Sequence, residues 1–104
     1  MSAVANPARG EVAISVAGRE LTLRPSFQAL VAAEGELGSL FALVERAAEG
    51  KLSLGEMAAL FWHCLHEAPE ELTRETLGEA LIEAGLAAAV PVLKRLLGQV
   101  LAGR

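Results

Sequence analysis

Residues 6–24 decide the fold of this chain, and they read NPARGEVAISVAGRELTLR. The apolar side chains of the two arms recur at every second position: Val12, Ile14, Val16, Leu21 and Leu23. A period of two is typical of a strand with one buried face. Gly18 stands between the arms, where a tight turn needs a positive φ. The stretch therefore predicts a β-hairpin, and because a lone hairpin is unstable in water, it must pack on the rest of the chain.

The rest of the chain is predicted to be helical, with helix starts marked by capping side chains. The expected N-caps are Ser26, Ser39, Ser53 and Thr73, and Ser53 with Glu56 has the pattern of a capping box. The positions expected to face inward are Phe27, Leu30 and Val31, then Leu40, Leu43, Val44 and Ala47, then Met57, Leu60, Phe61, Cys64 and Leu65, then Leu77, Leu81 and Ala84. Pro69 is expected to end the third helix, and a fifth is expected over about residues 87–102, with Pro91 in its first turn or at a kink.

The fold class that follows is α+β, mainly α: an N-terminal β-hairpin packed on a bundle of about five short helices. Residues 1–9 are predicted to be a mobile segment, and residues 10–104 a single domain. Apolar residues make up 53 % of the chain and aromatic residues only 4 %. The predicted core is therefore Leu, Val and Ala, with Phe27, Phe41, Phe61 and Trp62 as its large members. The apolar share exceeds the usual range of about 45–50 %, which indicates apolar surface for a partner.

Charge and cysteine content narrow the class of protein. The formal net charge is −4, from 9 basic and 13 acidic residues without a basic stripe, so nucleic-acid binding is disfavoured. Cys64 is the only cysteine, which excludes an internal disulfide and fits a reducing compartment. We find no signal-peptide pattern and no apolar run long enough to cross a bilayer. The sequence predicts a soluble cytoplasmic protein that binds neither nucleic acid nor membrane.

One cluster of side chains offers metal or thiol chemistry. On a helix, His63 would lie beside His66 and Glu67, but tight zinc binding needs a further ligand, and Cys64 falls on the apolar face. Two half-exposed histidines and a buried, inert thiol are therefore the favoured interpretation. We find no glycine-rich nucleotide motif, and the many carboxylates lie on solvated helix faces. The prediction is a non-enzymatic protein with no catalytic, cofactor-binding or metal residues.

Four large apolar residues are candidates for partner binding: Trp62, Leu96, Leu97 and Leu101. Trp62 lies at the edge of the apolar stripe of the third helix. It is either a residue at the edge of the core that packs on the hairpin or an anchor for a partner. The other three belong to the wide apolar stripe of the last helix. That helix is either the centre of the bundle or an element that docks into a groove elsewhere.

A string of structural residues resembles a known family. It comprises residues 6–12, Gly18, residues 21–24, Phe27, Ala29, Leu30, Glu34, residues 40–48, residues 50–53 and residues 58–60. With these residues the chain resembles the small tail protein of gene transfer agents and related siphophages. That family is classed with tail assembly chaperones and in some schemes is labelled a tail tube protein. The resemblance covers about Asn6 to Leu65, and the remainder agrees in helical character.

The resemblance implies a non-enzymatic role in building a phage-like tail. A tail assembly chaperone binds the long helical tape-measure protein, keeps it soluble and helps tail tube subunits to polymerise on it. The implied partners are thus the tape-measure protein and the tail tube protein, with a homo-oligomer left open. The implied location is the bacterial cytoplasm, in transient or stable association with phage-like tail particles. Two other classes stay open: a structural subunit retained in the particle, and a small metal- or thiol-dependent enzyme built on His63–Glu67.

Overall fold

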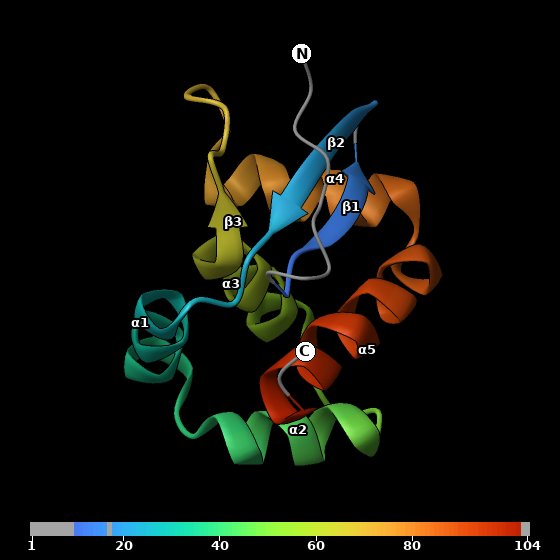
Figure 1. Ribbon diagram of the computed structural model, residues 1–104. Helices are drawn as coiled ribbons and strands as arrows, with labels where there is room; N and C mark the ends of the chain where they lie inside the picture. The colour runs from blue at the N-terminus through green and yellow to red at the C-terminus, as the bar shows by residue number, and fades with distance from the viewer. Residues whose placement is uncertain (1–9, 17, 103–104) are drawn as a thin grey trace.

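The computed structural model describes residues 10–16 and 18–102, and these form a small sheet packed on helices (Figure 1). The strands are β1 (Val12–Val16), β2 (Arg19–Leu23) and β3 (Leu65–His66). The helices are α1 (Phe27–Leu37), α2 (Leu40–Ala48), α3 (Leu54–Cys64), α4 (Arg74–Ala84) and α5 (Leu86–Ala102). The predicted α+β, mainly α class is confirmed. Residues 1–9, which the sequence predicts to be a mobile segment, lie outside the described residues.

The hairpin forms as the alternating pattern predicts. β1 and β2 pair antiparallel, with Val12 opposite Leu23 and Val16 opposite Arg19, and Gly18 has a φ of 73°. All five aliphatic side chains of the pattern are buried, and Leu23 is 0 % exposed. β1 packs on α4 and α5, so the hairpin is stabilised by the helices that follow it in sequence.

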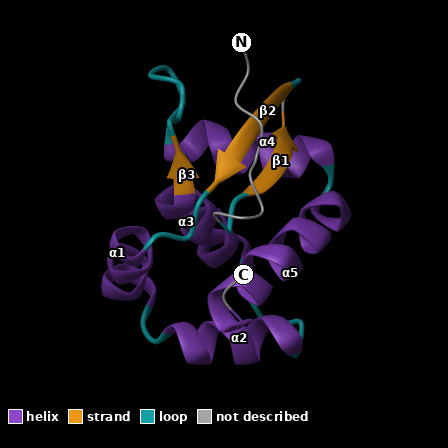
Figure 2. Ribbon diagram, viewed as in Figure 1, coloured by secondary structure: helices purple, strands orange, loops and turns teal. Residues whose placement is uncertain are grey.

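The third strand was not predicted. We expected the third helix to run to Pro69, but α3 ends at Cys64, and Leu65 and His66 pair antiparallel with the end of β2. The backbone amide of Arg24 also donates to the carbonyl oxygen of Cys64 at 2.6 Å. The free edge of β2 offers backbone hydrogen bonds that outweigh another helical turn. The strands lie side by side in the order β1-β2-β3 (Figure 2).

The predicted helix caps are confirmed. The hydroxyls of Ser26, Ser39, Ser53 and Thr73 accept hydrogen bonds from backbone amides three residues on. Ser53 and Glu56 complete the capping box, with bonds of 3.1 and 3.0 Å between each side chain and the other residue's amide. α5 begins directly after Gly85, and Pro91 lies beyond its first turn while the helix continues to Ala102.

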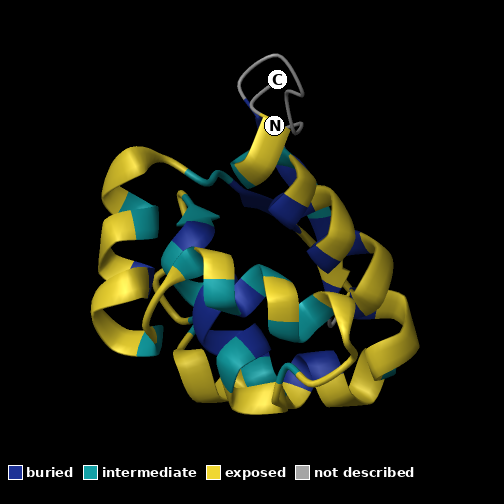
Figure 3. Ribbon diagram, turned by 90° about the horizontal axis from the view of Figure 1, so that it is seen from below, coloured by how far each residue is buried: buried dark blue, intermediate teal, exposed yellow. Residues whose placement is uncertain are grey.

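The buried core lies between the hairpin and the inner faces of α3, α4 and α5 (Figure 3). Its largest fully buried side chains are Phe61, Leu23, Leu43, Leu60, Leu77, Leu81, Leu96 and Cys64. None of the helices within residues 18–102 alone is long and apolar enough to cross a membrane. Two bent pairs of helices, α1 with α2 and α4 with α5, are together long and apolar enough for a membrane span by length and composition alone.

Some of the expected inward positions are wrong. Phe27 is 84 % exposed, Phe41 is 74 % exposed and Val31 is 51 % exposed, so none belongs to the core. Leu30 packs on the core as expected, together with Ala29, Ala33 and Leu37. Phe27 and Val31 lie on a different side of that helix because each residue advances by about 100°. Ala84 is also exposed, since Ala80 takes the inner position beside Leu81.

We expect Ile14→Ala to lower the free energy of unfolding by about 2–5 kcal/mol, because Ile14 is 4 % exposed and its truncation leaves a cavity. Urea denaturation followed by circular dichroism measures the change. Val31→Ala is the control, since Val31 is an aliphatic residue on the surface of α1. Equal midpoints for both variants would mean that the hairpin does not depend on its buried face.

The capping box gives a second stability prediction. Ser53→Ala should cost about 1 kcal/mol, because the amide of Glu56 at the start of α3 loses its acceptor. Thermal unfolding measures it, with Ser15→Ala as the control because Ser15 is exposed on β1 and caps no helix. An unchanged melting temperature for Ser53→Ala would contradict this role of the cap.

Candidate functional site

An apolar groove separates α2 from α5. α2 packs mainly on α1, and the space that it leaves toward α5 is a cavity of about 550 Å³. Val44, Ala47 and Ala48 line it from α2, and Gly50 and Leu52 line it from the turn that follows. Four of these five residues are small or β-branched, so the backbone of a bound segment could approach α2 closely.

The opposite wall is one stripe along α5. It consists of Leu86, Val90, Leu93, Lys94, Leu97, Gly98 and Leu101. Leu86 is 45 %, Val90 is 41 % and Leu101 is 56 % exposed, whereas Leu93 and Leu97 are buried at the base of the groove. α5 is therefore apolar on two sides: one side packs on the sheet and the other lines the groove. This explains the width of the stripe in the sequence.

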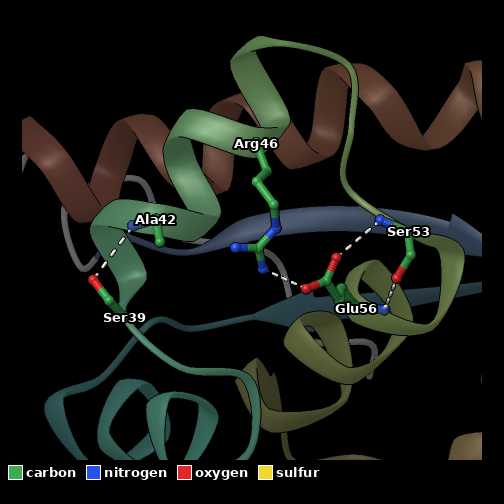
Figure 4. A network of polar contacts seen from close by, with 5 residues as sticks. All are labelled: Ser39, Ala42, Arg46, Ser53 and Glu56. Carbon is green, nitrogen blue, oxygen red and sulfur yellow. Dashed lines mark hydrogen bonds and ion pairs between the residues drawn. The ribbon is translucent and has the colours of Figure 1, made fainter.

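α2 is held in place by few contacts. Leu43 is its one buried residue, and Arg46 in its last turn forms an ion pair with Glu56 at the start of α3 (Figure 4). The Glu56 carboxylate also accepts a hydrogen bond from the backbone amide of Ser53. This bond has the largest effect, and the hydrogen bond from the Arg46 guanidinium the next largest, in lowering the pKa of the Glu56 carboxyl. The same glutamate thus caps α3 and ties the last turn of α2 to the start of α3.

The four predicted partner-binding residues lie in different environments. Leu97 and Leu101 line the groove, Leu97 as part of its base and Leu101 on its open side. Leu96 is 0 % exposed and belongs to the core. Trp62 is half-buried on α3, packs against the core and does not line the groove. Binding by any of the four stays a prediction, and the geometry makes Leu101 the residue most available to a partner.

The histidine cluster does not assemble as a helix would place it. His63 lies at the end of α3, and its Nε2 contacts Glu36 of α1 at 2.8 Å. His66 lies on β3, 3.9 Å from Glu67, which has a φ of 54°. Across residues 10–16 and 18–102, no three His, Cys, Asp or Glu side chains gather closely enough to hold a metal ion. Burial raises the pKa of the Cys64 thiol to about 12, so little of it is thiolate at neutral pH.

Glu36 is the centre of an ionic cluster that the sequence did not reveal. Its carboxylate accepts a hydrogen bond from the Arg74 guanidinium of α4 at 2.5 Å and also contacts His63 of α3. Because Glu36 itself lies on α1, the cluster joins three helices. The hydrogen bond from Arg74, and then the contact with His63, lower the pKa of Glu36 from 4.5 to about 2. Nothing in the local sequence signals this contact, because the partners are 27 and 38 residues away.

The Glu36 cluster predicts a pH dependence. Because the folded pKa lies below the unfolded one, the ion pair stabilises the fold above pH 4.5, and this contribution is lost as pH falls toward 2. The stability difference between the wild type and Glu36→Gln should shrink over that range. Urea denaturation at a series of pH values measures it, with Glu79→Gln on the surface of α4 as the control. A difference that is constant from pH 6 to pH 2 would contradict the pairing.

The comparisons with known proteins place the chain within a family. The fold and its groove define a small α+β module with an open apolar groove between α2 and α5. A family model described as phage tail tube protein, GTA-gp10, matches residues 9–103, so the chain belongs to this family of phage tail proteins. The match continues well beyond the Asn6–Leu65 stretch in which we found the resemblance. In the comparisons with curated proteins and with solved structures, nothing matches the chain.

Proposed function

We propose that this phage tail protein is a tail assembly chaperone that holds an amphipathic helix of the tape-measure protein in the groove between α2 and α5. The observation that carries the proposal is the groove itself. It is open, predominantly apolar and bordered by three large side chains that remain 41–56 % exposed in the isolated chain. Surface of this kind is typical of sites that dock a helix through its apolar face.

The dimensions of the groove suit a helix. At about 1.5 Å per residue, the stripe from Leu86 to Leu101 is about 22 Å long, which matches about four turns of a bound helix. Ala47, Ala48 and Gly50 on the facing wall leave room for the guest's own large side chains. Lys94 lies on the stripe, is exposed and forms no ion pair within the described chain, so it favours a guest with an acidic residue beside its apolar face.

The charge of the chain supports the same role. A tape-measure helix outside the tail exposes apolar surface that promotes aggregation, and the groove would cover it. The formal charge of −4 would then keep the complex soluble. In this proposal the chaperone acts in the bacterial cytoplasm, presents the tape-measure protein to tail tube subunits and carries out no chemical step.

A second candidate is a structural subunit that stays in the particle. The family description names a tail tube protein, and this favours the alternative. A chaperone leaves the finished tail, whereas a structural subunit remains in stoichiometric amount. Mass spectrometry of purified tails therefore distinguishes the two functions. An enzyme built on His63–Glu67 has no comparable support, since His63 is engaged with Glu36 and Cys64 is buried.

We predict that Leu101→Asp weakens capture of the tape-measure protein by about tenfold or more, because it places a charge in the apolar groove. Ile82→Asp is a matched control: Ile82 is also 56 % exposed, but it lies on α4 outside the groove. Both variants are co-expressed with the tape-measure protein, purified through a tag and checked by circular dichroism. Equal capture by the two folded variants would contradict the assignment of the groove. Failure of the wild type to co-purify would contradict the chaperone function.

A further inference from the structure

Among residues 10–16 and 18–102, no strand pairs with the outer edge of β1, which is called the free edge below. In the sheet order β1-β2-β3, β1 pairs with β2 on one side only. Alternate residues of an edge strand direct their amide and carbonyl groups away from the sheet, where another strand can pair with them. The opposite edge, β3, has only two residues and is followed by a backbone turn at Glu67. β1 has five residues, so it is the longer of the two edges.

A second cavity, separate from the α2–α5 groove, opens beside this edge. It has a volume of about 260 Å³ and lies between β1 and the corner where α4 meets α5. Four consecutive residues of β1, from Ala13 to Val16, form one wall. The corner contributes the small residues Ala84, Gly85 and Ala88, and the two helices diverge there by 116°. Because these side chains are small, they leave space alongside the strand.

A cationic side chain lines the same cavity. Arg95 of α5 lines it, is exposed and forms no ion pair with any other described residue. By contrast, Arg19, Arg46 and Arg74 each bind a glutamate. A guanidinium beside a free strand edge is suited to bind a carboxylate of whatever pairs with that edge.

We propose that β1 accepts an extended segment of a different protein as a fourth strand, and that Arg95 binds a carboxylate of that segment. Backbone hydrogen bonds to β1 supply affinity, and the space above Ala84 and Ala88 takes aliphatic side chains of the guest strand. This site is separate from the α2–α5 groove, so the chain would hold a helix and a strand at the same time. Two surfaces of this kind let one small protein bring two tail components together.

The free edge is better suited to another protein than to a second copy of this chain. Residues 12–16 read VAISV and contain no carboxylate. Glu11, directly before β1, is 6 % exposed and already engaged in an interaction. A symmetric pairing of two β1 strands would therefore bring no free acidic group from β1 to Arg95.

The probe is a capped heptapeptide of alternating valine and threonine that ends in aspartate. It is titrated to millimolar concentration into the isotope-labelled full chain and followed by amide chemical shifts. We expect shifts that saturate at Ala13, Ser15 and the α4–α5 corner. One of two peptides that are N-methylated at alternate residues should fail to bind, since only one set of amides faces β1. Absence of shifts at β1, or equal binding of both methylated peptides, would overturn the proposal.

The role of Arg95 is tested by matched variants. Arg95→Gln should weaken binding of the aspartate peptide by about tenfold, to the affinity of the corresponding asparagine peptide. Lys94→Gln is the control, because Lys94 is the cation next to Arg95 in sequence but lines the α2–α5 groove instead. Leu101→Asp should bind the peptide as the wild type does, so this result stands whether or not the tape-measure protein is captured. Equal losses for Arg95→Gln and Lys94→Gln would overturn the carboxylate assignment. Concentration-dependent dimers that Ser15→Pro dissolves would assign the edge to a second copy and overturn the proposal as well.

Discussion

The structure depends on burial of the hairpin's aliphatic face against the helices. A hairpin of two five-residue strands does not persist alone in water, and β1 packs on α4 and α5 to bury its side chains. In return the hairpin covers the inner faces of those helices, and Leu23, Leu81 and Leu96 are each at most 1 % exposed in one continuous core. With so few aromatic residues, this core gains its stability from many aliphatic contacts.

That packing leaves part of the apolar surface uncovered. α3, α4 and one side of α5 are used by the core, whereas α2 has one buried residue, Leu43, and packs on the core through the partly buried Val44 and Ala47. The second side of α5 then faces α2 across a gap, which small residues of α2 line. The ion pair of Arg46 with Glu56 ties the last turn of α2 to α3. The groove therefore follows from the packing of the helices: α4 and α5 pack on the sheet, and a space remains between α5 and α2. In our proposal the phage tail protein uses it to hold a partner helix.

Local signals in the sequence predicted much of the fold. The period-two pattern located the hairpin, and the caps at Ser53 and Thr73 located two helix starts, because each of these depends on residues that are close in sequence. β3 could not be predicted, since it forms only because the edge of β2 lies nearby in space. Phe27 and Phe41 were misplaced for a related reason: apolar character does not say which side of a helix meets the core. The sequence indicated only part of the candidate groove. The wide stripe of α5 includes Leu97 and Leu101, whose role in binding stays a prediction, but the facing wall and the Glu36 cluster depend on contacts between distant segments.

Hydrogen exchange of the chain, alone and in complex with the tape-measure protein, tests the central claim most directly. α2 should exchange readily in the free chain, because it has one buried residue and few anchors. If a helix of the tape-measure protein occupies the groove, binding should slow amide exchange in Leu40–Ala48 and along the exposed side of α5, and should leave α3 unchanged. Slowed exchange confined to the sheet or to α4, with α2 exchanging as fast as before, would contradict the account.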